Sequence, residues 1–186
     1  MNLLNSILIL AMTFVSVFLE ATFPVTRHLF GAQVDLLPAL MVCAAFTTDL
    51  ITVALVAIFG GLWFDSLSAN PFGISILPLF VIGFLISLWR DLMLRELPFA
   101  QLFLGAAASA VAPVMTVLLL LSGGIQPLLG WGSLWQWIVM TAGGAVATPL
   151  LFLILEMCND ALGYKLKSQT SFRSDREILR TTKFKK

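Results

Sequence analysis

The sequence predicts an all-α polytopic membrane protein, a bundle of about six transmembrane helices, and two observations favour it. Hydrophobic residues make up 59% of the 186 residues and charged residues only 11%, and the mean hydropathy is +0.98. A water-soluble domain needs a larger share of charged side chains on its surface. The apolar residues are also gathered into long segments that short polar runs separate, as expected of membrane-spanning helices.

Six apolar segments follow one another along the chain. They run from about Leu3 to Phe23, Leu36 to Phe46, Leu50 to Phe64, Gly73 to Trp89, Phe99 to Leu121, and Ser133 to Met157. The first segment has no basic residues before it and no small-residue cleavage site after it, so we expect a retained anchor. We expect one transmembrane bundle over residues 1–164 and a basic cytoplasmic tail over residues 165–186.

The stretch from Leu36 to Phe64 can be divided in two ways. As one helix of about 29 residues it would extend about 43 Å, well beyond a hydrocarbon core of roughly 30 Å, and would place Asp49 inside the membrane. A turn at Thr47-Thr48-Asp49 gives two short helices instead, which must lean on their neighbours. We prefer two helices, which makes six spans in place of five.

The distribution of Lys and Arg predicts the orientation. Eight of the eleven basic residues lie in the tail, which should therefore be cytoplasmic, as should the loop that contains Arg90 and Arg95. The uncharged connection from Ser122 to Gly132 then lies on the opposite side. Tryptophans, which favour the headgroup region, flank that connection at Trp131, Trp135 and Trp137. With six spans the N-terminus is also cytoplasmic, and with five it is not.

Small residues at helical spacing predict close helix packing, because helices in lipid associate through close contact rather than through the hydrophobic effect. The sets are Ala54, Ala57, Gly61 and Asp65; Gly105 with Ser109; Ala106 with Ala110; Gly143 with Ala147; and Gly144 with Thr148. Prolines inside three segments, at Pro78, Pro113 and Pro149, are expected to kink their helices.

The run from Gly60 to Gly73 is the main polar interruption. Asp65 shares a small-residue stripe with Gly61, and Asn70-Pro71 has the order of an N-cap followed by proline at the first helical position. Gly73 would allow close approach of the next helix. The run is either a site or a plain helix–turn–helix connection. The other carboxylates, Glu20, Asp35, Asp49 and Glu156, are expected near the ends of spans.

Catalytic chemistry has little support in the sequence. His28 is the only histidine, Cys43 and Cys158 lack metal-like spacing, and no phosphate loop, zincin pair or nucleophile elbow is present. We therefore expect no enzyme, no cofactor, no metal site and no nucleic-acid partner. In the tail, Arg173, Arg176 and Arg180 would share one face of a helix. They would contact anionic lipid, at about 1 kcal/mol for each residue, or a cytoplasmic partner.

Two stretches resemble a known family, the bacterial rod shape-determining protein MreD. One is Asp35-Leu-Leu-Pro-Ala-Leu, and the other is Gly61-Leu-Trp-Phe-Asp65-Ser-Leu-Ser-Ala-Asn-Pro-Phe-Gly73-Ile-Ser. The second is similar to the family pattern of Gly, an apolar pair, Asp, a short polar link, then proline or a small residue, an apolar residue and Gly. A hydrophobic helix that ends in basic residues, here Arg90 and Arg95, follows as in the family. The long basic tail departs from the pattern.

The resemblance implies a non-enzymatic scaffold in the bacterial inner membrane that serves cell elongation and lateral peptidoglycan synthesis. It implies as partners the bitopic protein MreC, the MreB filament and the synthase formed by RodA and penicillin-binding protein 2. It also implies an architecture similar to the substrate-binding components of energy-coupling-factor vitamin transporters. We expect small-residue faces to dock partner helices, and Gly61, Asp65 and Gly73 to set the geometry of an outward-facing turn. The alternative function is small-molecule (vitamin) uptake, which needs a pocket with convergent polar groups.

Overall fold

A computed structural model describes residues 3–22, 31–68, 70–90, 98–125 and 130–161 of the chain. In these ranges the chain forms six α-helices and is all-α, as the sequence predicts. They are α1 (Leu3–Thr22), α3 (Leu37–Thr47), α4 (Leu50–Leu67), α5 (Ile76–Trp89), α6 (Pro98–Ser122) and α7 (Trp131–Ala161). Arg95 and the tail residues Arg173, Arg176 and Arg180 lie outside the described residues, so the expectations for them stay predictions.

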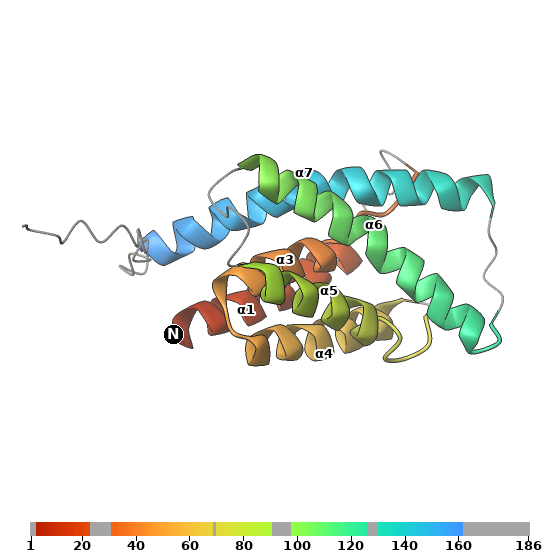
Figure 1. Cartoon of the computed structure of the whole chain (residues 1–186), viewed down its shortest axis with the longest axis horizontal. Helices are drawn as coiled ribbons and strands as arrows, with labels where there is room; N and C mark the ends of the chain where they lie inside the picture. Colours follow the sequence, from red (N-terminus) through yellow and green to blue (C-terminus); the bar gives the residue numbers. More distant parts are fainter. Residues whose placement is uncertain (1–2, 23–30, 69, 91–97, 126–129, 162–186) are drawn as a thin grey trace, which may run out of the picture.

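The helices run roughly along the long axis of the molecule and alternate in direction (Figure 1). The start of α1, the turn between α3 and α4, and the end of α7 lie at one end, on the left of the figure. The turn between α4 and α5 and the facing ends of α6 and α7 lie at the other end. We call the end with the start of α1 the terminal end of the bundle, and the end with the turn between α4 and α5 the far end. The chain therefore crosses the bundle once with each helix.

The division of the stretch from Leu36 to Phe64 into two helices is confirmed. Helix α3 ends at Thr47, Asp49 is the N-cap of α4, and α4 begins at Leu50. Asp49 has extended backbone angles, φ −89° and ψ 164°, and its side chain caps no backbone N–H. The turn works because a carboxylate at this position stays at the end of the bundle and out of the hydrocarbon.

Four of the six helices are long and apolar enough to cross a membrane: α1, α4, α6 and α7. With 11 and 14 residues, α3 and α5 are only about 16 and 21 Å long. Helix α3 is enclosed by protein, because every residue from Leu37 to Ala45 is buried and the helix contacts all five other described helices. A short helix in that position does not need to match the thickness of the bilayer.

The chain is thus a multi-pass integral membrane protein, with α3 at the centre of its bundle. The core around α3 is formed by apolar residues of every neighbour, including Ile9, Val53, Ile82 and Phe152. The outer faces are also apolar, with Phe14, Phe59 and Phe103 more than half exposed. An apolar surface of this extent on several helices fits contact with lipid rather than water.

Thr52 of α4 donates to the Ser6 hydroxyl of α1 at 2.9 Å, and six other threonine hydroxyls find a partner in their own helix. Each donates to the carbonyl four residues earlier, at 2.7–3.0 Å, and this holds for Thr13, Thr47, Thr48, Thr116, Thr141 and Thr148. Placing a hydroxyl in hydrocarbon costs little free energy when it makes a hydrogen bond of this kind. The hydroxyl protons of these residues are therefore used within the helices.

The prolines differ in their effects. Pro113 and Pro149 lie inside α6 and α7, as predicted. The prediction of a kink at Pro78 is wrong, because Pro78 is the third residue of α5 and lies in its first turn, where the N–H has no intrahelical acceptor.

Candidate functional site

Asp65 joins two helices at the far end of the bundle. It lies in the last turn of α4 and is only 2% exposed. Its Oδ2 accepts a hydrogen bond from the Ser75 N–H at 3.1 Å, and its Oδ1 accepts one from the Ser75 hydroxyl at 2.6 Å. Ser75 is the N-cap of α5. The carboxylate therefore caps the next helix and places negative charge at its N-terminus, which the helix dipole favours.

Two glycines allow this contact. A Cβ on Gly61, one turn before Asp65, would lie 3.0 Å from the Ile76 backbone nitrogen, so only glycine lets α4 and the start of α5 come this close. Gly73 has φ +87°, a left-handed conformation that glycine adopts without strain. Gly73 does not allow the close approach of the next helix that the sequence predicts, because a Cβ there would lie 3.7 Å from Ile76 Cδ1, an ordinary contact. That Gly61, Asp65 and Gly73 set the geometry of an outward-facing turn stays a prediction.

The prediction that Asn70 and Pro71 begin the next helix is wrong. Asn70 lies in a bend, Pro71 in an irregular position, and α5 begins only at Ile76. Because Asp65 takes both donors of Ser75, the helix starts after Ser75. Residues 72–75 form a turn instead, in which the Ile74 N–H donates to the Pro71 carbonyl at 3.2 Å.

Asp35 lies at the same end, immediately before α3. Its Oδ1 accepts a hydrogen bond from the Leu37 N–H at 2.8 Å and so caps that helix. Burial and the nearby Asp65 carboxylate raise the pKa of Asp35 from 3.8 to about 6. Asp35 and Asp65 thus have the same role, because each accepts a hydrogen bond from a backbone N–H at the start of a short helix.

A chain of amides ties the far end together. Gln33 Nε2 donates to Glu20 Oε1 at 3.1 Å, which links the end of α1 to the segment before α3. Gln136 on α7 contacts the main chain of Gln33 with both amide atoms, accepting from its N–H at 3.0 Å and donating to its carbonyl. Sequence analysis missed Gln33, because nothing in the sequence brings it to a residue 103 positions away.

The carboxylates do not form a metal site. Among the described residues, no group of three His, Cys, Asp or Glu side chains could hold a metal ion. Glu156 is exposed near the end of α7, one turn before Asp160 and at the opposite end of the bundle from Asp35 and Asp65. At the terminal end, Arg90 Nη1 donates to the Thr48 carbonyl at 3.0 Å, which links the end of α5 to the turn between α3 and α4.

The small-residue faces pack within the bundle. A Cβ on Gly105 of α6 would overlap Thr148 and would lie 2.6 Å from the Gly144 carbonyl oxygen of α7, and one on Gly144 would overlap Ser109. Gly143 packs against Val34 in the same way. The faces at Gly105, Gly143 and Gly144 are therefore covered by other parts of this chain, whereas Ala106 and Ala110 are half-buried, and the docking of partner helices stays a prediction.

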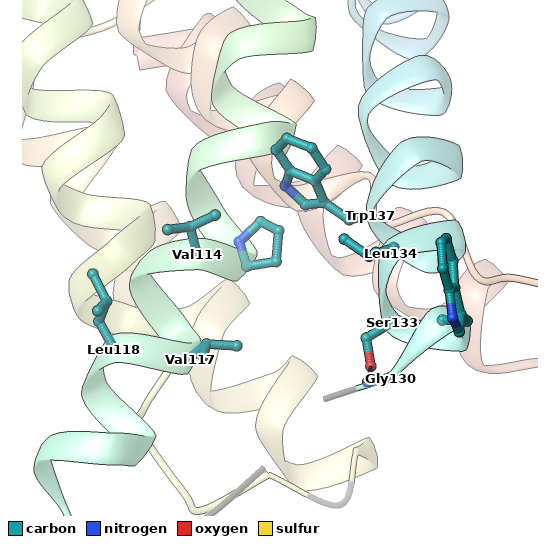
Figure 2. Close-up of a pocket in the computed structure, with 9 residues that line it drawn as sticks. Val114, Val117, Leu118, Gly130, Ser133, Leu134 and Trp137 are labelled. Atoms are coloured by element: carbon teal, nitrogen blue, oxygen red, sulfur yellow. Dashed lines mark hydrogen bonds between the residues drawn. The ribbon is translucent and has the colours of Figure 1, made fainter. Parts of the chain in front are cut away.

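A groove of about 700 Å³ lies between α6 and α7 and opens toward the far end (Figure 2). Its α6 wall includes Pro113, Val114, Val117 and Leu118, and its α7 wall includes Leu134 and Trp137. In Figure 2, Val117 and Leu134 point toward one another across the opening. The sequence assigned Trp137 to a headgroup belt, but its indole N–H donates to the Ala110 carbonyl of α6 at 2.9 Å.

Comparison of the chain with protein families, with curated proteins and with solved structures finds no match. The function must therefore be argued from the residues and their arrangement.

Proposed function

We propose that this chain is a non-enzymatic scaffold subunit of the bacterial cell-elongation complex, in the inner membrane. Its partners in this proposal are a bitopic MreC-like protein, an MreB-like filament and the synthase of RodA and penicillin-binding protein 2. The resemblance to the MreD family, in Asp35 to Leu40 and Gly61 to Ser75, suggests these partners.

The position of α3 in the centre of the bundle favours a scaffold over a small-molecule uptake component. Every residue of α3 from Leu37 to Ala45 is buried, and every residue from Ala39 to Ala45 is at 0% exposure. A component that captures a vitamin needs an enclosed pocket with several polar groups directed into it. Central packing by α3 favours a protein that works through its outer surfaces.

The residues that carry the resemblance also act as structural groups. Asp65 and Asp35 cap α5 and α3, and Gly61 lets α4 approach the start of α5. Their polar atoms are used inside the chain. This use supports a role in shaping the bundle, as a scaffold requires, rather than a role in chemistry.

The proposal is tested in the bacterium that encodes the chain. We expect the tagged chain, purified in mild detergent, to bring down the MreC-like protein and the synthase, and we expect its depletion to turn rod-shaped cells round. Purified chain that binds a vitamin at nanomolar concentration, together with unchanged cell shape on depletion, would contradict the proposal.

The tail adds a second contact in this proposal, between Arg173, Arg176 and Arg180 and the filament on the cytoplasmic side. Replacing these three with Ser should reduce filament co-purification. The matched control replaces Lys183, Lys185 and Lys186 with Ser, which removes the same charge from the same tail. An equal loss in both variants would indicate attraction to anionic lipid alone.

A further inference from the structure

We propose that Asn5 of α1 and Asn159 of α7 bind an internal water molecule, which bridges the two helices at the terminal end of the bundle. Such a water site holds the first and last helices of the chain together. It goes beyond the proposed function and does not depend on any partner in it.

Asn5 and Asn159 are polar side chains in the protein interior. Asn5 is 2% exposed and Asn159 is 1% exposed. Among the described residues, neither amide atom of Asn159 has a hydrogen-bond partner, and Asn5 Oδ1 has none either. Burying an amide without hydrogen bonds costs free energy, and buried polar groups in native proteins nearly always have a partner. The two side chains therefore need a partner that the packed helices do not provide.

The two asparagines occupy corresponding positions on their helices. Asn5 lies one turn before Ile9 on α1, and Asn159 lies one turn after Leu155 on α7. Ile9 and Leu155 are both at 0% exposure and belong to the same apolar core. The start of α1 and the end of α7 lie at the terminal end (Figure 1). Each asparagine thus continues the inward face of its helix to that end of the bundle.

The boundary between α1 and α7 is the least packed in the ring of described helices around α3. In this ring α1 packs on α4, α4 on α5, α5 on α6, and α6 on α7, and the ring closes where α7 meets α1. The contact between α7 and α1 is the smallest of these. A small molecule between the ends of α1 and α7 therefore displaces little close packing of side chains.

Direct hydrogen bonds join α1 to its neighbours elsewhere. At the terminal end, the Thr52 hydroxyl of α4 donates to the Ser6 hydroxyl of α1 at 2.9 Å. At the far end, Gln33 links α1 to α7, because its side chain and its main chain bond to the two helices. A water between Asn5 and Asn159 gives α1 and α7 a polar link at the terminal end as well.

The unpaired atoms specify a small neutral molecule that both donates and accepts hydrogen bonds. Asn159 offers an N–H donor and a carbonyl acceptor, and Asn5 offers a carbonyl acceptor. Water can donate to both carbonyl oxygens and accept from the N–H. A buried water makes about three hydrogen bonds with otherwise unpaired groups, which matches these atoms. Both side chains are almost completely enclosed, and this favours water over a larger ligand.

Nuclear magnetic resonance on the full chain in detergent micelles tests the site directly. The isotope-labelled side-chain amide of Asn159 is assigned by the absence of its signal in Asn159→Leu. We expect a nuclear Overhauser effect between this amide and water, with the sign of a long-lived bound molecule, and loss of this effect in Asn5→Leu. No such effect in the native protein, or one that Asn5→Leu leaves unchanged, would overturn the bridge.

Thermal unfolding gives an independent measurement, in which the sign of the shift decides. Leucine has the branched shape of asparagine without its polar atoms. We expect Asn5→Leu and Asn159→Leu each to lower the unfolding temperature, because the bridging hydrogen bonds are lost. The double variant should lower it by less than the sum of the two shifts. A higher unfolding temperature in Asn159→Leu would contradict the site, since leucine in place of an unpaired buried amide is stabilising.

Ser109→Ala is the matched control. Ser109 is also buried, at 0% exposure, and its hydroxyl also has no partner among the described residues. This hydroxyl lies so close to Gly144 that a Cβ on the glycine would overlap it, so no water fits between them. We expect Ser109→Ala to keep or raise the unfolding temperature. A drop as large as that of Asn159→Leu would show that the loss does not come from a bridge and would contradict the inference.

Discussion

Asp65 shows how one side chain decides the course of the backbone in an apolar bundle. It is buried at the end of α4 and uses both carboxylate oxygens on Ser75. A buried donor without a partner costs about 1–3 kcal/mol. The turn between α4 and α5 is therefore held by the hydrogen bonds from Ser75 to Asp65. Gly61 makes room for this contact, and Gly73 allows the positive φ of the turn.

We expect Asp65→Leu to destabilise the protein by about 1–3 kcal/mol, because the Ser75 hydroxyl and N–H lose their acceptor in a buried place. Ser75→Ala should cost less, about 0.5–1.5 kcal/mol, since it removes one hydrogen bond and leaves no hydroxyl unpaired. Thermal unfolding in detergent measures both. The double variant should cost little more than Asp65→Leu alone, and simple addition of the two effects would contradict the pairing.

At the scale of elements, the helices are organised by where close contact is possible. Helices α6 and α7 cross at Gly105 and Gly144, where the two backbones come together without intervening side chains. Beyond Pro113 the same helices separate and leave the groove. The crossing and the groove are two consequences of one arrangement, because helices that the glycines bring together at one level separate on either side of it.

We expect Gly105→Ala to destabilise the α6–α7 pair by about 1–3 kcal/mol, because its Cβ would meet Thr148 and the Gly144 carbonyl. The matched control is Gly132→Ala, also at a helical glycine, where a Cβ meets nothing within 4 Å. That change should be neutral or slightly stabilising, since alanine favours the helix more than glycine. Equal effects of the two substitutions on thermal unfolding would show that the crossing does not depend on close approach.

At the scale of the whole molecule, the number of passes sets the side on which each terminus lies. Six helices that alternate in direction bring the start of α1 and the end of α7 to the same end (Figure 1). The short helices α3 and α5 also run between the two ends of the bundle, packed against longer neighbours, and that they count as membrane passes stays a prediction. The basic tail at this end then predicts that both termini are cytoplasmic.

We expect reporter fusions at the N-terminus and after residue 186 to report the cytoplasmic side, and a reporter inserted at the exposed Gly124 to report the opposite side. An even number of passes with basic residues retained inside gives this pattern. N- and C-terminal reporters on opposite sides would indicate five passes and a different path through α3 and α4.

The sequence by itself determined the membrane environment, the six helices and the turn at Asp49, because these depend on local composition and on the length of apolar runs. It also pointed to Gly61 and Asp65, since their spacing on one helix face is a local property, and to Gly73 in the turn that follows. The prediction of a helix start at Asn70 and Pro71 was wrong. Helix α5 begins after Ser75 instead, because Ser75 donates to Asp65, ten residues earlier.

Only the tertiary structure decided which surfaces are used within the chain and which stay open. The small faces at Gly105 and Gly144 pack against one another between α6 and α7, whereas Val117 and Leu134 line a groove between the same helices. The tertiary structure joined Gln33 to Gln136 across 103 positions. In an apolar chain nearly every face suits lipid and protein equally well, so the pattern of residues cannot show which faces meet. That outcome depends on how the helices fit against one another in space.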